Sequence, residues 1–273
     1  MIKIEKVSIY GLEEAIRGMR NPMNSWDKSD SGICGGGDGH MGCLNCSEYD
    51  KCDHYFDKEF HIGKADHNLM MRLSNGGPVH AKYRRMITVY LDITAPLYWW
   101  KEFDTYKVGT VANSQSTMHK IAAKEFTLED FSHEHLMNVP GKNVLPPLSV
   151  LKTTIDTLNA YRTLYLGESM PDGSICIPEN RKEIWWQMIQ LLPSSYNQKR
   201  TVMLNYEVLA GIYPMRKNHK LDEWVDFCHW IESLPYSEII MSSSGLDLNS
   251  INALQGAARN SSKGYIYKRK TED

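Results

Sequence analysis

Four cysteines lie close together near the start of the chain, at Cys34, Cys43, Cys46 and Cys52. Thiolates are ligands of tetrahedral zinc, and the C-x2-C pair formed by Cys43 and Cys46 can bring two of them to one ion. The glycines at 35–37 would let the backbone fold closely around a metal. We therefore expect these cysteines to hold one zinc ion in a structural site. An iron–sulfur cluster and a flexible loop with free thiols are the alternatives.

A second group of polar and basic residues lies in the middle of the chain, and a third lies further on. Lys101 and Lys107 are cationic, and the run Asn113–Thr117 consists of small polar residues. Arg216 and His219 form the third group. Cationic side chains beside a polar turn can hold a phosphate together with the backbone N–H groups of the turn. Considered singly, lysines are usually solvated charges, and a polar run indicates only a turn or a helix cap.

Hydrophobic periodicity indicates which elements position these groups. Residues 85–94 alternate β-branched or apolar residues with the side chains between them, which predicts a strand. Apolar residues at helical spacing predict helices over 12–19, 66–73, 96–103, 148–165, 179–192, 220–233 and around 251–258. The long stretch 21–63 has little periodicity and is expected to be irregular. The sequence therefore predicts one helix-rich α+β domain.

The composition limits the classes of function. Lys+Arg 31 against Asp+Glu 33 give a net charge of −2, which argues against binding nucleic acid or a membrane through a basic surface. No apolar stretch approaches the roughly 18 residues that a membrane span needs. The start of the chain lacks the apolar stretch of a signal peptide, so we expect a cytoplasmic protein without structural disulfides. We expect one domain over 1–241, with the cysteine-rich insertion 24–63, followed by a C-terminal helix and polar tail over 242–273.

Several segments, taken in order, resemble the flavin-dependent thymidylate synthases, the ThyX family. The series begins with Asp66-x2-Leu69-x3-Leu73-x6-His80 and a strand ending at Ala95-Pro96, and it continues through an aromatic helix to Asn113–His119. On the C-terminal side, Arg216-x2-His219-x-Leu221-x2-Trp224 is similar to a further family segment. The resemblance covers most of the chain outside the insertion and implies a small, mainly antiparallel sheet.

The family's signature R-H-R-x2-S-x-N-E-x-S-x-R-Y is only partly kept in this sequence. Thr105, Tyr106 and Lys107 fall on R-H-R, while Ser114 falls on the glutamate and Met118 on the last arginine. Family arginines neutralise the nucleotide phosphate with planar guanidinium groups that bind in a bidentate way. Threonine and methionine cannot do this, so we expect weaker nucleotide binding and slow or absent turnover.

The resemblance implies reductive methylation of dUMP to dTMP, with methylenetetrahydrofolate as the one-carbon donor and FAD as the hydride carrier. It implies a homotetramer, because family sites are built between subunits. The aromatic side chains over 96–105 and 220–233 also predict an oligomer interface. No catalytic residue is assigned. The implied cofactor-binding residues are Tyr106, Lys107, Asn113 and His219, and the implied substrate-binding residues are Lys101, Glu102, Ser114, Gln115, Ser116 and Arg216.

Two other hypotheses stay open. In the first, the chain is a non-catalytic protein that binds a uridine nucleotide on the same fold, since a fold can persist after its catalytic activity is lost. Alternatively, the cysteine-rich loop is the functional part, a metal-held module that docks a partner. Binding of dUMP without turnover would favour the first of these, and a stoichiometric metal without nucleotide binding would favour the second.

Overall fold

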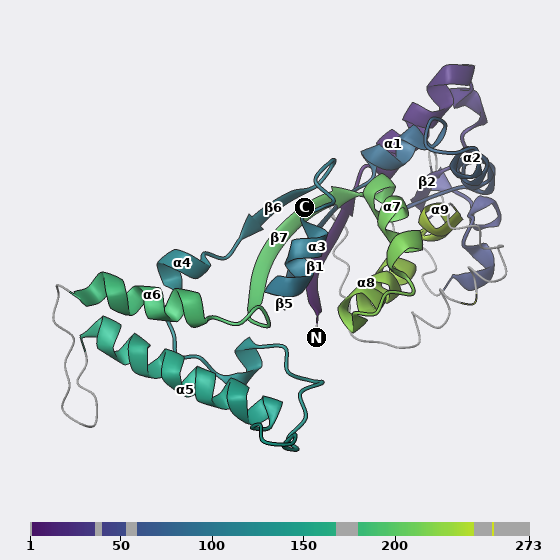
Figure 1. Ribbon diagram of the computed structural model, residues 1–273. Coiled ribbons are helices and arrows are strands. Elements are labelled where there is room, and N and C mark those ends of the chain that lie inside the picture. The colour runs from purple at the N-terminus through teal and green to yellow at the C-terminus, as the bar shows by residue number, and fades with distance from the viewer. Residues whose placement is uncertain (1, 36–39, 53–58, 168–179, 243–252, 254–273) are drawn as a thin grey trace. The chain divides into compact units, whose positions relative to one another are not determined.

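The computed structural model describes residues 2–35, 40–52, 59–167, 180–242 and 253 (Figure 1). Contacts between Cα atoms divide the chain into two compact units. The first unit comprises Met1–Lys3, Ile93–Thr105 and Asn113–Arg200. The second unit comprises Ile4–Asp92, Tyr106–Ala112 and Thr201–Asp273.

The main sheet has four strands in the order β1-β5-β7-β6. The predicted strand is β5, in which Val89, Leu91 and Ile93 are each at most 1 % exposed. It begins at Thr88 rather than 85 because residues 81–86 form the 3₁₀ helix η5 (Ala81–Met86), which packs on helices of the second unit. The helix-rich α+β class with a small antiparallel sheet is confirmed. The strands are β1 (Lys3–Tyr10), β5 (Thr88–Pro96), β6 (Val111–Ser114) and β7 (Asn197–Asn205).

Two long helices, α5 and α6, lie side by side in the first unit (Figure 1). Helix α5 begins at Pro147, where a missing backbone N–H costs nothing, and it is followed by Gly167 in the left-handed conformation. Their shared core includes Leu151, Leu158 and Met188. The helices of this unit are α3 (Leu97–Phe103), α4 (Thr117–Lys120), α5 (Pro147–Leu166) and α6 (Arg181–Leu191).

The second unit packs α7 against α8, α9 and η5. The sequence analysis did not predict α7, because Gly211 and Pro214 within it are residues that usually disfavour a helix interior. The asparagine at 205 starts it, since its side-chain oxygen accepts a hydrogen bond from Val208 N at 3.1 Å. The helices of this unit are α1 (Leu12–Arg20), α2 (Lys64–Asn75), α7 (Tyr206–Arg216), α8 (Asp222–Ser233) and α9 (Glu238–Met241).

The aromatic helices predicted to form an oligomer interface are instead part of the core. Trp99, Trp100 and Phe103 of α3 are at most 1 % exposed, and Trp224 and Trp230 of α8 are fully buried. The prediction that these side chains need a second copy to cover them is therefore wrong. A single chain already buries them.

The cysteine-rich insertion is more regular than expected. It contains the strands β2 (Gly32–Cys34), β3 (His40–Met41) and β4 (Phe60–His61), which form a sheet in the order β3-β2-β4. β2 runs parallel to β3 and antiparallel to β4, with Ile33 opposite both His40 and Phe60. Such short strands carry too few residues for a period of two to stand out in the sequence.

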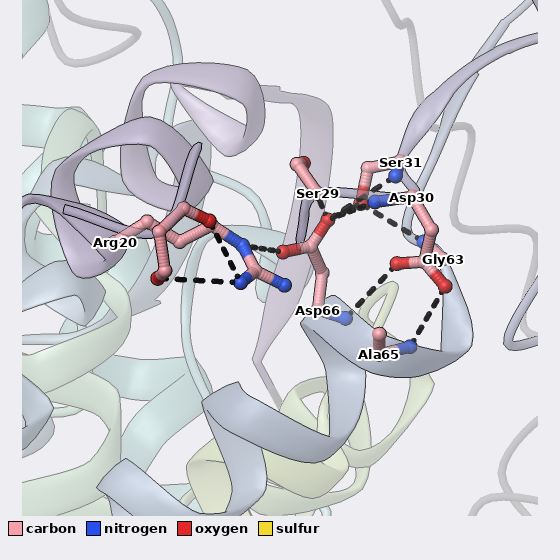
Figure 2. Close-up of polar contacts among 8 residues, drawn as sticks. Arg20, Ser29, Asp30, Ser31, Gly63, Ala65 and Asp66 are labelled. Carbon is pink, nitrogen blue, oxygen red and sulfur yellow. Dashed lines mark hydrogen bonds and ion pairs between the residues drawn. The ribbon is translucent and has the colours of Figure 1, made fainter. Parts of the chain in front are cut away.

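A polar network fixes this insertion to the helices beside it (Figure 2). Arg20 Nε at the end of α1 donates to Asp66 Oδ1 in α2 at 2.6 Å, and both side chains are buried. Asp66 Oδ2 accepts from the hydroxyls of Ser29 and Ser31 at 2.7 Å each and from the backbone N–H groups of Asp30 and Ser31 at 3.1 Å each. Both oxygens of a buried carboxylate are thereby satisfied.

Asp30 of the insertion also binds the first turn of α2. Its carboxylate accepts hydrogen bonds from Ala65 N at 2.8 Å and Asp66 N at 3.0 Å, within the first turn of α2 (Figure 2). These N–H groups have no partner within the helix, and a negative charge beside them also suits the helix dipole. The start of the insertion therefore caps α2 from outside its own sequence.

Among the helices in the described part of the chain, none is long and apolar enough to cross a membrane.

Candidate functional site

In the second unit, Arg216 at the end of α7 gathers several of the residues singled out from the sequence. Its Nε donates to Tyr106 Oη at 2.8 Å, and its Nη1 lies 2.9 Å from His219 Nε2. The guanidinium carbon lies 4.5 Å from the ring centroid of Trp224, a distance typical of a cation–π contact. Two implied cofactor residues and one implied substrate residue thus contact one another.

The hydrogen bonding of His219 is informative about what this cluster could hold. Leu221 N donates to His219 Nδ1 at 3.1 Å, so a neutral ring carries its proton on Nε2. That nitrogen faces Arg216 Nη1, which is itself a donor. With this tautomer a donor faces a donor at 2.9 Å, so the contact is not a hydrogen bond, and these two nitrogens alone do not form a site for an anion.

Aromatic rings surround this pair of donors. Trp224 is fully buried and makes edge contacts with Tyr106 and with His219, at centroid distances of 5.9 and 6.4 Å. Tyr106 and His219 are half-buried. A guanidinium between rings keeps its charge at the edge of a water-poor site, where that charge attracts an anion more strongly than it would in bulk water. We define Tyr106, Arg216, His219 and Trp224 as the Arg216 cluster.

In the first unit, the polar run that follows β6 is held against β7. Gln115 N donates to Lys199 O at 2.9 Å, and Gln198 Nε2 donates to Gln115 O at 3.0 Å and to Thr117 Oγ1 at 2.8 Å. Ser116 caps α4, because its hydroxyl accepts from His119 N at 3.2 Å. The helix-cap interpretation of this run is therefore correct for Ser116.

Arg200 is a cation of this unit that the sequence analysis did not single out. Its guanidinium carbon lies 4.1 Å above the ring of Trp100, its Nε donates to Gln198 Oε1 at 3.0 Å, and its Nη1 donates to Asp104 Oδ1 at 2.8 Å. Gln198 and Arg200 share one face of β7 with the buried Val202 and Leu204. In the sequence, Gln198 and Arg200 continue the alternation of the apolar residues Val202 and Leu204, and this pattern could have identified both polar residues.

The other predicted site residues lie at the surface. Lys107 is exposed in the second unit, and Lys101 is exposed in the first unit. Glu102 is half-buried in the first unit, and its backbone carbonyl accepts from Thr105 Oγ1 at 2.7 Å. Asn113 and Ser114 are exposed at the end of β6.

The four cysteines of the insertion lie within its small sheet and turns. Cys43 and Cys46 flank a tight turn in which Cys46 N donates to Cys43 O at 3.0 Å, and Cys34 and Cys46 are buried. Burial raises the pKa of the Cys46 thiol more than a hydrogen bond with the backbone of Glu48 lowers it, and the charges of Glu48, Cys52 and Cys34 add to the rise. Within the described ranges, no group of three or more His, Cys, Asp or Glu side chains is arranged to hold a metal ion. Zinc stays a prediction.

Behind the Arg216 cluster, α7 and α8 share a buried acid. Tyr213 Oη donates to Glu232 Oε1 at 2.7 Å, and Ser237 Oγ donates to the carbonyl of Glu232 at 2.7 Å. Burial raises the pKa of Glu232 more than the Tyr213 hydrogen bond lowers it. Burial also raises the pKa of Cys228 to about 12, as expected for the small buried hydrophobe that its helix position predicted.

Solved structures provide the comparison with known proteins. No family model and no curated protein matches the sequence. The chain is similar to thymidylate synthase ThyX from Helicobacter pylori, solved with FAD and dUMP, with a TM-score of 0.54 and 13% identity over 90% of this chain and 100% of that one. It is also similar to the UMP/dUMP methylase PolB from Streptomyces cacaoi, bound with 5-Br dUMP, with a TM-score of 0.51 and 11% identity over 90% and 96% of the two chains. The chain has a ThyX-like fold.

This result confirms, at the level of the fold, the resemblance drawn from the order of sequence segments. Identities of 11–13% are too low to transfer an activity, so the likeness establishes the architecture alone. On this ThyX-like fold the residues that could hold ligands are those of the Arg216 cluster in one unit, and Arg200 with the Gln115–Thr117 segment in the other.

Proposed function

We propose that this ThyX-like protein binds a uridine nucleotide and FAD and converts dUMP to dTMP with methylenetetrahydrofolate. The observation that best supports the proposal is the guanidinium of Arg216 held by Tyr106 and Trp224, because a planar cation with a fixed orientation suits a phosphate. The neighbours H. pylori ThyX and S. cacaoi PolB were solved with FAD and dUMP and with a uridine nucleotide analogue, respectively.

The nucleotide phosphate is the anion that we assign to this cluster. Arg216 offers a planar guanidinium already oriented by Tyr106 and Trp224, so little side-chain entropy is lost on binding. The Arg216 guanidinium takes over part of the charge neutralisation that signature arginines would provide.

The remaining contacts are divided as the resemblance implies. We assign Tyr106, Lys107, Asn113 and His219 to the cofactor, and Lys101, Glu102, Ser114, Gln115, Ser116 and Arg216 to the substrate. FAD, when bound and reduced, supplies the hydride of the methylation.

Calorimetric titration with dUMP and with FAD tests binding, and the visible spectrum of the purified protein tests for flavin. An assay for tritium release from dUMP labelled at the methylated carbon, with folate and NADPH present, then tests turnover. We expect both ligands to bind and tritium to be released slowly. Failure of both ligands to bind would reject the proposal.

A second candidate function is nucleotide capture without chemistry. The observation that favours it is the replacement of two signature arginines by Thr105 and Met118, which are both exposed and cannot bind a phosphate through a charge. Binding of dUMP with no tritium release would establish this alternative over the enzymatic one.

We also propose a cytoplasmic homotetramer with zinc on the four cysteines of the insertion. Val108, Val111 and Met215 of the second unit are 93%, 60% and 73% exposed, and large apolar side chains in water favour contact with another subunit. Light scattering that returns the monomer mass of 31.4 kDa would reject the oligomer. Elemental analysis of protein prepared without chelator, with no stoichiometric metal found, would reject zinc.

A further inference from the structure

A cavity of about 220 Å³ lies in the second unit between α1, the segment that follows it, and strand β4. Its lining includes Arg17 and Arg20 from α1 and the aromatic side chains of Trp26 and Phe60. This volume is below the roughly 300–1,000 Å³ of sites for drug-sized ligands, so it suits a molecule with a single ring. It is built partly from the insertion and contains none of the residues of the Arg216 cluster.

One nitrogen of the Arg20 guanidinium, Nη2, could donate hydrogen bonds to an anion. Arg20 is 4% exposed, and its Nε and Nη1 are engaged by Asp66 and by the carbonyl and hydroxyl of Ser25. Among the described residues no hydrogen bond is made by its Nη2, as Figure 2 shows for the network drawn there. A guanidinium has five N–H donors in a fixed plane, so this edge is oriented before any ligand arrives.

Two guanidinium groups and two carboxylates lie in or beside the lining of the cavity. Arg17 lies three residues before Arg20 on the same face of α1 and is exposed. Glu13 is the one carboxylate among the lining residues, against two guanidinium groups. Asp66 lies outside the lining, and its two oxygens are already occupied by Arg20, Ser29, Asp30 and Ser31. Because Asp66 balances the charge of Arg20 and Glu13 balances that of Arg17, an anion would be held by the guanidinium hydrogen bonds and not by an excess of positive charge.

The aromatic wall favours a ring. Trp26 is 51% exposed, yet its indole is held in place because Nε1 donates to Asn21 Oδ1 at 2.8 Å. Phe60 is half-buried, and Ile16 closes the apolar side at 3% exposure. A fixed indole with an open face gains by stacking on an aromatic ring and by covering its apolar surface.

We propose that this cavity binds a single-ring aromatic carboxylate, with the carboxylate on Arg17 and Arg20 and the ring between Trp26 and Phe60. The Arg20–Asp66 network holds the site in its binding geometry. The site is independent of the proposed nucleotide and flavin chemistry, because none of its residues is assigned to either ligand.

Sodium benzoate is the probe, titrated into the full-length protein by calorimetry, with benzyl alcohol as the uncharged ring and acetate as the ringless anion. We expect benzoate to bind at least about tenfold more tightly than either, since the loss of the charge or of the ring each removes about 1.4 kcal/mol or more. Equal binding of benzoate and benzyl alcohol, or no benzoate binding up to about 10 mM, would overturn the proposal.

Two surface substitutions test the geometry without removing the buried ion pair. We expect Arg17→Gln and Trp26→Ala each to weaken benzoate binding by about tenfold or more, while circular dichroism and the unfolding midpoint stay unchanged. Arg72→Gln, at an exposed arginine of α2 outside the cavity, is the matched control and should leave binding as it is. If neither Arg17→Gln nor Trp26→Ala changes the affinity, benzoate binds elsewhere and the assignment is wrong.

Discussion

The guanidinium of Arg20 and the carboxylate of Asp66 form an ion pair of 2.6 Å between α1 and α2, with side chains that are 5% and 0% exposed. An isolated buried charge would cost several kcal/mol, but each partner here is also hydrogen-bonded by backbone and hydroxyl groups. Asp66 also accepts hydrogen bonds from Ser29 and Ser31, so the pair is one of the contacts that tie the insertion to the helices.

Asp66→Asn should destabilise the protein by about 3–5 kcal/mol, because it leaves the Arg20 charge buried without a counter-charge. The measurement is the free energy of unfolding from denaturant titration. Asp27→Asn, at an exposed aspartate of the same segment, is the control and should change stability by less than about 0.5 kcal/mol. A small effect at both positions would show that the pair contributes little.

The pH dependence of stability should carry the signature of Asp66. Burial alone would raise the pKa of this carboxyl, but hydrogen bonds from Ser31, Ser29 and Arg20, with the Arg20 charge, lower it below its ordinary value of 3.8. The stabilisation is thus present above pH 3.8 and is lost as the pH falls through the lower folded-state pKa. Asp66→Asn should therefore lose stability less steeply than wild type in acid. Parallel acid curves would contradict this.

Glu232 should give the opposite pH dependence of stability to that of Asp66. Burial raises its pKa above the ordinary 4.5, so the folded protein holds a proton that the unfolded chain releases, and stability falls as the pH rises from 4.5 to the folded-state pKa. Glu232→Gln keeps an acceptor for Tyr213 and removes this cost. We expect a higher melting temperature at neutral pH and little change below pH 4.5. A lower melting temperature at neutral pH would mean that the ionised carboxylate is the stabilising form.

Gly11→Ala should destabilise the start of α1 by about 2 kcal/mol or more. Gly11 has a φ of 89°, and a Cβ there would lie 2.1 Å from the carbonyl oxygen of Met86. Gly77→Ala is the matched control, because its φ is 91° but no atom lies within 4 Å of the added Cβ. Backbone strain alone should cost about 1 kcal/mol at that position. Equal losses at both sites would exclude the clash as the cause.

Arg216→Lys should weaken dUMP binding by about 10- to 150-fold, since lysine keeps the charge but loses the planar hydrogen bonds to Tyr106 and to an anion. Calorimetric titration measures the change. Arg72→Lys, on an exposed face of α2, should bind dUMP as the wild type does. An unchanged affinity in Arg216→Lys would place the phosphate elsewhere.

The sequence alone determined the elements whose residues repeat with a clear period. The alternation over 85–94 identified β5, and helical spacing identified α5 and α8 to within a few residues. These predictions succeed because a buried face demands apolar side chains at the period of its own backbone. The order of these elements also carried enough information to identify the ThyX-like fold.

Only the tertiary structure decided which polar residues meet. Arg20 and Asp66 are 46 positions apart, and Tyr106 and Arg216 are 110 apart. No local pattern records such contacts, because they depend on how distant helices pack. The same holds for α7, where packing against α8, α9 and η5 stabilises a helix that its glycine and proline would otherwise weaken. The aromatic rings of α3 and α8 were visible in the sequence, but the fold decided that they fill a core.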